Sequence, residues 1–200
     1  MKINYKNKNN IVYTYYEEIS VNRGWMLDYW KKSWQKNGWE TVILNENNAK
    51  KHPKYKQVLN KINTMPTVNP REYENACYLR WVAMACIGGL MTDIDVININ
   101  YKPTFFEYYE LECYEYGRVP CMVSGSKKEY ERVIQWILDW RGDTHHVSDM
   151  YLFIKNRPLL RNIICEQYNG NNSSPTIHCS YGSCGNNREG IIRGLCENKI

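Results

Sequence analysis

The segment from residue 76 to residue 96 constrains the fold of this chain more than any other. A mostly apolar run at residues 82–87 predicts the end of a buried helix, and the glycine pair Gly88-Gly89 stops that helix. Leu90-Met91-Thr92 then predicts a short strand, which runs directly into Asp93-Ile94-Asp95. A helix that passes into a strand in this way is a unit of α/β folds. We therefore expect an α/β protein in which one strand ends in an Asp-x-Asp motif.

The Asp-x-Asp motif offers two carboxylates from alternate positions at a strand end. Carboxylate oxygens are the ligands that hard divalent cations such as Mg²⁺ and Mn²⁺ prefer. A cation held there would neutralise a diphosphate, which is the leaving group of a nucleotide sugar. A lone Asp-x-Asp is common by chance, so the hypothesis depends on its spacing from Arg80 and from the glycine pair.

The run Ala76-Cys77-Tyr78-Leu79-Arg80-Trp81, followed by the glycine pair and the Asp-x-Asp motif, resembles the DXD region of GT-A glycosyltransferases. One sugar-transferase group of that family carries Ser-Asp-x-x-Arg-Tyr ahead of Gly-Gly and Asp-x-Asp. This chain matches that spacing without a gap, with Ala76-Cys77 at the Ser-Asp positions. The resemblance implies a single GT-A-like domain over residues 1–200, with a mostly parallel central sheet flanked by helices.

The resemblance also implies an activity. It is the metal-dependent transfer of a sugar from a nucleoside-diphosphate sugar, such as a UDP- or GDP-sugar, to a hydroxyl group of a glycan acceptor. Asp95 is expected to be the main ligand of Mn²⁺ or Mg²⁺, and Asp93 is expected to contact the metal or the donor sugar. His178 lies in a segment similar to the family's late His and Gly-Ser positions, and it is expected to be a third metal ligand.

Further roles follow from the same resemblance. Asp149 is similar to an acid at a helix start, which either deprotonates the acceptor in an inverting reaction or supports the site in a retaining one; His145-His146 is a weaker alternative base. Arg80 is expected to reach the donor from its helix. The other residues expected at the donor are the glycine pair and three residues of the first strand: Gly88, Gly89, Tyr13, Thr14 and Tyr15.

Apolar periodicity and turn residues predict the remaining elements. A strand, a helix and a second strand at the start of the chain are typical of a nucleotide-binding α/β sheet. Predicted strands cover residues 11–15, 41–44 and 119–123, and predicted helices cover residues 25–36, 55–62, 69–87, 129–140 and 148–155. Asn69 is expected to be the N-cap of the helix that carries Arg80.

Composition excludes some functions. The net charge of +5 comes from scattered basic residues, so we expect no nucleic-acid partner. No apolar run is long enough for a membrane span, and residues 1–10 do not resemble a signal peptide, so we expect a cytoplasmic protein. The 8 cysteines are then expected to be free thiols. A zinc site at His178, Cys179, Cys184 and Cys196 is disfavoured, because these residues lack a C-x2-C pair.

Two alternative functions remain open at this stage. A non-catalytic protein that binds carbohydrates or nucleotide sugars would fit the 17 Tyr and 7 Trp residues and the absence of the family's Ser-Asp pair. A phosphatase with Asp-x-Asp-x-Thr after its first strand would use the first Asp as a nucleophile. Ile97 stands at the Thr position here, and the motif lies in the middle of the chain. Both facts disfavour the phosphatase.

Overall fold

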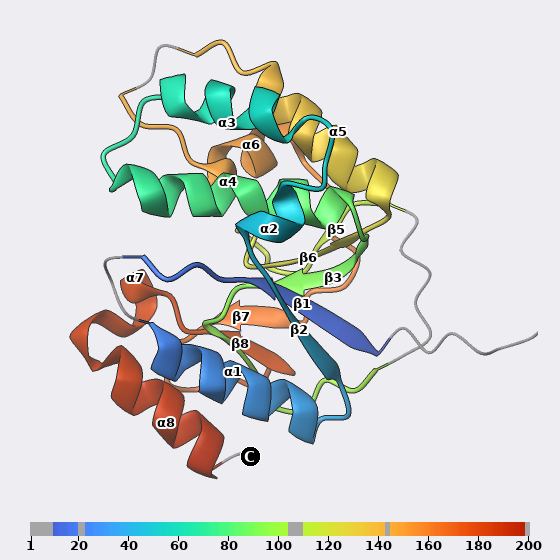
Figure 1. Cartoon of the computed structure of the whole chain (residues 1–200). Helices are drawn as coiled ribbons and strands as arrows, with labels where there is room; N and C mark the ends of the chain where they lie inside the picture. Colours follow the sequence, from blue (N-terminus) through green and yellow to red (C-terminus); the bar gives the residue numbers. More distant parts are fainter. Residues whose placement is uncertain (1–9, 20–22, 104–109, 143–144, 199–200) are drawn as a thin grey trace, which may run out of the picture.

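A computed structural model describes residues 10–19, 23–103, 110–142 and 145–198, so most of the polar N-terminal segment lies outside the described residues. A five-stranded sheet with the order β2-β1-β3-β6-β5 runs through the centre, between two groups of helices (Figure 1). Its strands are β1 (Ile11–Tyr15), β2 (Glu40–Leu44), β3 (Gly89–Thr92), β5 (Glu112–Cys113) and β6 (Met122–Gly125). The expected α/β class is confirmed.

The central sheet is mixed, so the expected mostly parallel sheet is wrong. β1 pairs in parallel with β2 and with β3, but β6 is antiparallel to β3 and β5 is antiparallel to β6. Parallel neighbours need a crossover connection, usually a helix. No helix is found between β3 and β6 in the described part of that stretch, and the chain returns beside β3 in the opposite direction.

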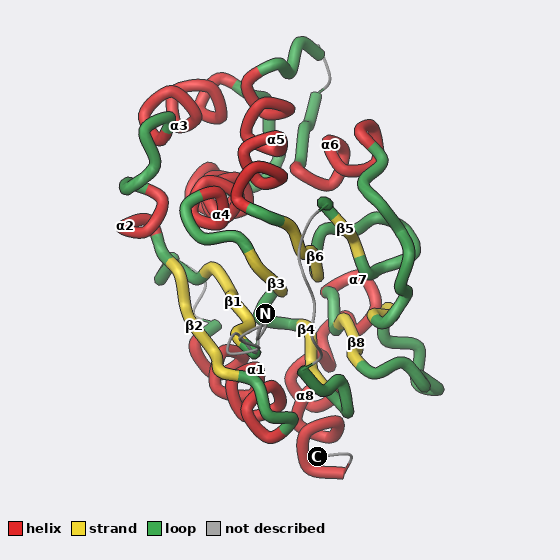
Figure 2. Tube along the Cα trace, turned by 90° about the vertical axis from the view of Figure 1, so that its right-hand side faces the viewer, coloured by secondary structure: helices red, strands yellow, loops and turns green. Residues whose placement is uncertain are grey.

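A second sheet of three strands has the order β4-β8-β7 and contains β4 (Val96–Asn98), β7 (Cys165–Gln167) and β8 (Thr176–His178). β4 follows the Asp-x-Asp motif and pairs antiparallel with β8, with Val96 opposite His178. Figure 2 shows β4 and β8 side by side. This pairing brings His178 next to the motif, although the two are far apart in the sequence.

Helices cover both faces of the sheets. One group lies above the central sheet in Figure 1, and α1 and α8 lie below it. The upper group comprises α2 (Glu46–Ala49), α3 (Tyr55–Thr64), α4 (Arg71–Ala85), α5 (Lys127–Leu138) and α6 (Asp149–Asn156). The lower group comprises α1 (Gly24–Lys36) and α8 (Arg188–Asn198), with α7 (Tyr181–Cys184) and the 3-10 turn η1 (Gly185–Asn187) leading into α8. No helix among the described residues is long and apolar enough to cross a bilayer.

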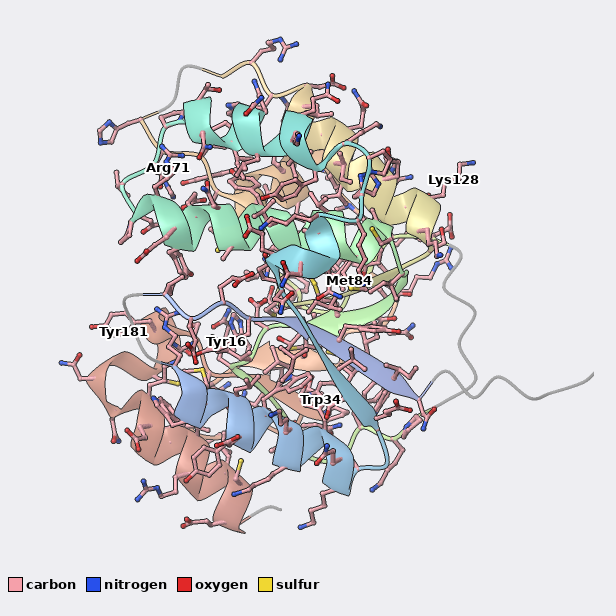
Figure 3. All side chains as sticks on the ribbon, viewed as in Figure 1. Tyr16, Trp34, Arg71, Met84, Lys128 and Tyr181 are labelled. Carbon is pink, nitrogen blue, oxygen red and sulfur yellow. The ribbon has the colours of Figure 1, made fainter. Side chains whose placement is uncertain are left out.

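Two buried tryptophans of α1 anchor the strands on either side of the Asp-x-Asp motif. The Trp30 indole donates a hydrogen bond of 2.8 Å to Thr92 Oγ1 at the end of β3. The Trp34 indole donates one of 3.0 Å to the carbonyl of Val96 at the start of β4, and Figure 3 shows Trp34 beneath the strands. A buried indole pairs its N–H whenever it can. These tryptophans therefore position the motif from below and are not available to stack on a sugar.

Candidate functional site

A cleft of about 430 Å³ opens where β1 and β3 end, which is where ligands of open α/β sheets bind. Its floor is the Asp-x-Asp motif. Tyr15 and Tyr16 enter from the end of β1, and Tyr181 enters from α7. Figure 3 shows Tyr16 and Tyr181 on the same side of the molecule. The remaining walls are the first half of α4, the loop before α6, and the start of α8.

Three of the predicted residues converge on the cleft floor. Asp93, Asp95 and His178 each offer one ligand atom, and all of these atoms lie within 4.8 Å of one another. Asp93 and Asp95 follow β3 directly, and His178 is placed by the pairing of β4 with β8. Two carboxylates and one imidazole form a mixed oxygen and nitrogen set that could hold a divalent cation.

The hydrogen bonding of Asp95 fits a cation ligand. Its Oδ2 atom contacts Arg188 Nη2 and lies 3.5 Å from His178 Nε2. Its Oδ1 atom is buried and has no hydrogen-bond partner among the described residues. A buried carboxylate oxygen without a partner is costly and calls for an explanation, such as a bound ion. A divalent cation would supply the missing interaction.

Two side chains behind His178 fix its imidazole ring. The amide of Gln167 lies 3.0 Å from His178 Nδ1, and the Ser180 hydroxyl donates a hydrogen bond of 2.8 Å to Gln167 Oε1. Metal-binding histidines commonly donate their second N–H to an oxygen, so a metal on Nε2, or a proton on both ring nitrogens, requires the Gln167 amide to turn its Oε1 atom toward Nδ1. With Nδ1 occupied, Nε2 is the nitrogen that faces Asp95.

The charges of this cluster perturb one another. Burial by itself lowers the pKa of His178, but the Asp95 carboxylate outweighs it and raises that pKa to about 9. Burial raises the pKa of Asp93 to about 6, with the Asp95 charge adding to the effect and Arg80 opposing it. Burial also tends to raise the pKa of Asp95, but His178 and Arg188 outweigh it and leave this pKa below its usual value. His178 is therefore protonated at neutral pH when no metal is bound.

These pKa values predict how metal binding depends on pH. Because a metal needs the unprotonated Nε2 of His178, binding must release the proton that its pKa of about 9 keeps there. Mn²⁺ affinity should rise about tenfold per pH unit between the Asp93 pKa of about 6 and the His178 pKa of about 9. Below a pH of about 6, a second proton binds to Asp93, so the Mn²⁺ affinity should fall more steeply as the pH is lowered. Calorimetry in buffers of different ionisation enthalpy measures the number of protons released when the metal binds. Near pH 7.5, the wild type should release about one proton and His178→Gln almost none.

Stability provides an independent check of the same pKa. A histidine whose pKa is raised on folding contributes stability that is fully present below its unfolded pKa. That contribution is lost as the pH rises through the folded pKa of about 9. The metal-free protein should therefore lose more stability between neutral pH and pH 9 than His178→Gln loses. Equal losses in the two proteins, or an Mn²⁺ affinity that does not change with pH, would contradict the assigned ion pair.

Arg80 lies in the cleft wall, where it pairs with two carboxylates. Its Nε and Nη2 atoms donate to Asp149 Oδ2 at 3.1 and 2.5 Å, and its Nη1 atom contacts Asp93 Oδ1. The Trp81 indole donates a third hydrogen bond, of 3.0 Å, to the same oxygen of Asp149. A carboxylate oxygen that already accepts three hydrogen bonds is a poor proton acceptor. Of the two expected roles for Asp149, this geometry favours support of Arg80 over acceptor deprotonation.

Four other residues expected at the donor lie away from the cleft. A separate hollow is lined by Gly88, Gly89 and Tyr13. The glycines lie at the start of β3, whereas the aspartates follow its end, roughly 13 Å further along the chain. Thr14 is fully buried, and its side chain lies on the face of β1 that packs against α1, together with that of Val12. Tyr15 does line the cleft, and Tyr16 lies beside it.

Arg188 is the main residue at the cleft floor that the sequence did not indicate. It lies at the start of α8, where its Nη2 atom contacts Asp95 and its Nε donates a hydrogen bond of 2.6 Å to the Cys179 carbonyl. Its sequence surroundings are polar and carry no motif. Only the chain path through β8 and α7 brings it to the aspartates.

No cysteine among the described residues belongs to a candidate metal cluster. Within the described residues, the one group with suitable spacing for a metal contains Asp93, Asp95 and His178 and no cysteine. Cys179 and Cys184 are buried, Cys196 is half-buried, and all three are free thiols.

Neither protein-family models, nor curated proteins, nor solved structures match this chain. The functional argument therefore depends on the residues of the cleft.

Proposed function

We propose that this protein is a metal-dependent glycosyltransferase that moves a sugar from a nucleoside-diphosphate sugar to a hydroxyl acceptor. The observation that carries the proposal is the convergence of Asp93, Asp95 and His178 in a cleft at the strand ends, with Arg80 and Arg188 beside them. Such a cluster combines ligands for one divalent cation with nearby guanidinium groups. A diphosphate is the substrate group that needs both.

Each residue has a task in this proposal. Asp95 and His178 would hold the cation, which as a Lewis acid would stabilise the charge that develops on the departing diphosphate. Arg188 neutralises Asp95 in the structure and would turn its planar guanidinium to the phosphate oxygens. Arg80 holds Asp93 in place from the opposite side. Tyr15 and Tyr16 offer aromatic surface for the nucleotide base at the end of β1.

The proposal predicts that nucleoside diphosphates bind only together with Mn²⁺. We expect UDP or GDP at a hundred times its dissociation constant, with Mn²⁺ present, to stabilise the fold by about 2.7 kcal/mol. The same nucleotide with a chelator should stabilise it little, because the diphosphate would then face Asp93, Asp95 and Glu17 without a cation between them. Thermal shift measures this difference, and UMP or GMP provides the matched control without a second phosphate.

A panel of nucleotide sugars then tests turnover by Mn²⁺-dependent release of the nucleotide. Release that persists in chelator would contradict the proposal. Release of phosphate from an aryl phosphate would favour the phosphatase. Sugar binding without any donor turnover would favour a non-catalytic binding protein.

A further inference from the structure

Glu74 is a carboxylate of the cleft wall that the proposed metal site does not use. It lies in the first turn of α4, and only 2 % of its surface is exposed. Its Oε2 atom accepts hydrogen bonds of 3.1 Å from Thr67 Oγ1 and 2.9 Å from Asn69 Nδ2. Its Oε1 atom is buried and has no hydrogen-bond partner among the described residues. One half of this carboxylate is therefore held by neutral donors, and the other half lacks a donor.

The Asn69 side chain binds Glu74 and does not cap α4. The sequence predicted Asn69 as the N-cap, but Pro70 occupies that position and no side chain caps the helix. Asn69 Nδ2 donates to Glu74 instead, and Arg71 donates to the carbonyls of Ile62 and Met65. The basic residue closest in sequence therefore points away from Glu74. A buried carboxylate without a cation is costly to keep, which indicates a functional reason for it.

The wall around Glu74 consists of two loops that are joined by hydrogen bonds. Val147 N donates to the Pro66 carbonyl at 3.0 Å, and Val68 N donates to His146 Nδ1 at 3.4 Å, so the loop before α4 is tied to the loop before α6. His146 also lines the cleft, and its imidazole ring is held in place by this bond to Nδ1. A carboxylate beside neutral donors repels anions and suits a group that both donates and accepts, which is a hydroxyl.

We propose that Glu74, Asn69 and His146 form a hydroxyl-binding subsite for a sugar ring, in which Glu74 Oε1 accepts a hydrogen bond from a sugar hydroxyl. The identification of the hydroxyl as that of a sugar rests on the proposed glycosyltransferase function. The sugar belongs either to the donor or to the acceptor, since both present hydroxyl groups to the same cleft. The subsite would distinguish sugars by the position of that hydroxyl.

The test is Glu74→Gln, because the amide can keep the internal contacts of Glu74. Its carbonyl oxygen can take the place of Oε2 and accept from Thr67 and Asn69, which leaves an NH₂ group where Oε1 stood. The substitution thus turns the unpartnered acceptor into a donor at constant volume. Glu131→Gln is the matched control, because it removes the same charge from α5, outside the cleft.

Calorimetry would compare three ligands: a nucleoside diphosphate with Mn²⁺, the corresponding nucleotide sugar with Mn²⁺, and a free oligosaccharide. We expect Glu74→Gln to bind the diphosphate as the wild type does, and to bind either the nucleotide sugar or the oligosaccharide about ten- to hundredfold more weakly. A loss with the nucleotide sugar assigns the subsite to the donor, and a loss with the oligosaccharide assigns it to the acceptor. Glu131→Gln should bind all three ligands like the wild type.

The subsite would be overturned if Glu74→Gln bound both sugar ligands with unchanged affinity. It would also be overturned if Glu74→Gln lost as much affinity for the nucleoside diphosphate as for the ligands that contain a sugar. If Glu74→Gln does not fold, Glu74→Asp keeps the charge but withdraws the oxygens by one methylene group, and it should show the same selective loss. The wild-type titration with diphosphate and Mn²⁺ tests the proposed function separately. Weaker oligosaccharide binding by Glu74→Gln, in a protein that binds no diphosphate, would retain the subsite and reject the transferase.

Discussion

Asp95→Asn is expected to abolish Mn²⁺-dependent nucleotide binding and all sugar transfer. Asn keeps the size of the side chain but removes the charge that a divalent cation requires. Oδ1 of Asp95 has no partner among the described residues that would explain its burial. Loss of an outer-shell partner typically weakens metal binding ten- to hundredfold, so loss of a direct ligand should weaken it by more than about a hundredfold. Calorimetry with Mn²⁺ and nucleotide release from a donor sugar measure the two effects.

The fold of Asp95→Asn should survive, because the partners of Asp95 keep other contacts. Arg188 retains its bond to the Cys179 carbonyl, and His178 retains the Gln167 amide. We expect a loss of about 1–3 kcal/mol in unfolding free energy, so binding should be measured well below the melting temperature. Asp139→Asn, at the exposed end of α5, is the control for loss of one carboxylate. Wild-type Mn²⁺ affinity in folded Asp95→Asn would remove Asp95 from the metal site.

Arg80→Met is expected to lower the free energy of unfolding by about 3–5 kcal/mol, the usual cost of stranding a buried charge. Asp149 is only 5 % exposed, and within the described part of the chain it would keep just the Trp81 indole as a hydrogen-bond partner. Asp93 would lose its guanidinium contact at the same time. Arg80→Lys should also be destabilising, because an ammonium group cannot form the fork that reaches both carboxylates. Urea unfolding at neutral pH measures the loss.

A double mutant separates the stranded charge from the lost packing. Adding Asp149→Asn to Arg80→Met removes the unpaired carboxylate, so the double mutant should be more stable than Arg80→Met alone. Arg132→Met provides the control on the surface of α5, where a half-exposed ion pair with Glu129 should be worth less than about 1 kcal/mol. A loss for Arg80→Met no larger than the loss for Arg132→Met would show that Arg80 serves ligands and not the fold.

Local patterns predicted the elements that lie around the site. The helices expected at residues 25–36, 55–62 and 148–155 are present within a few residues, and β3 ends at the Asp-x-Asp motif as predicted. Each of these depends on periodicity, turn residues or glycine stops, which operate over a single turn or a few residues. The strand expected at residues 119–123 begins only at Met122, because its pairing with β3 decides where it starts.

The sequence by itself determined the α/β class, the two aspartates at a strand end, and the helix that carries Arg80. Only the tertiary structure decided that β6 runs antiparallel, that Gly88 and Gly89 lie away from the cleft, and that Arg80 is bound by Asp149. It also placed Arg188 on Asp95 and left an oxygen of Glu74 unpartnered. The physical reason is range: caps and periodicity act between neighbours in the chain, whereas strand pairing and the meeting of charges depend on the path of the whole backbone.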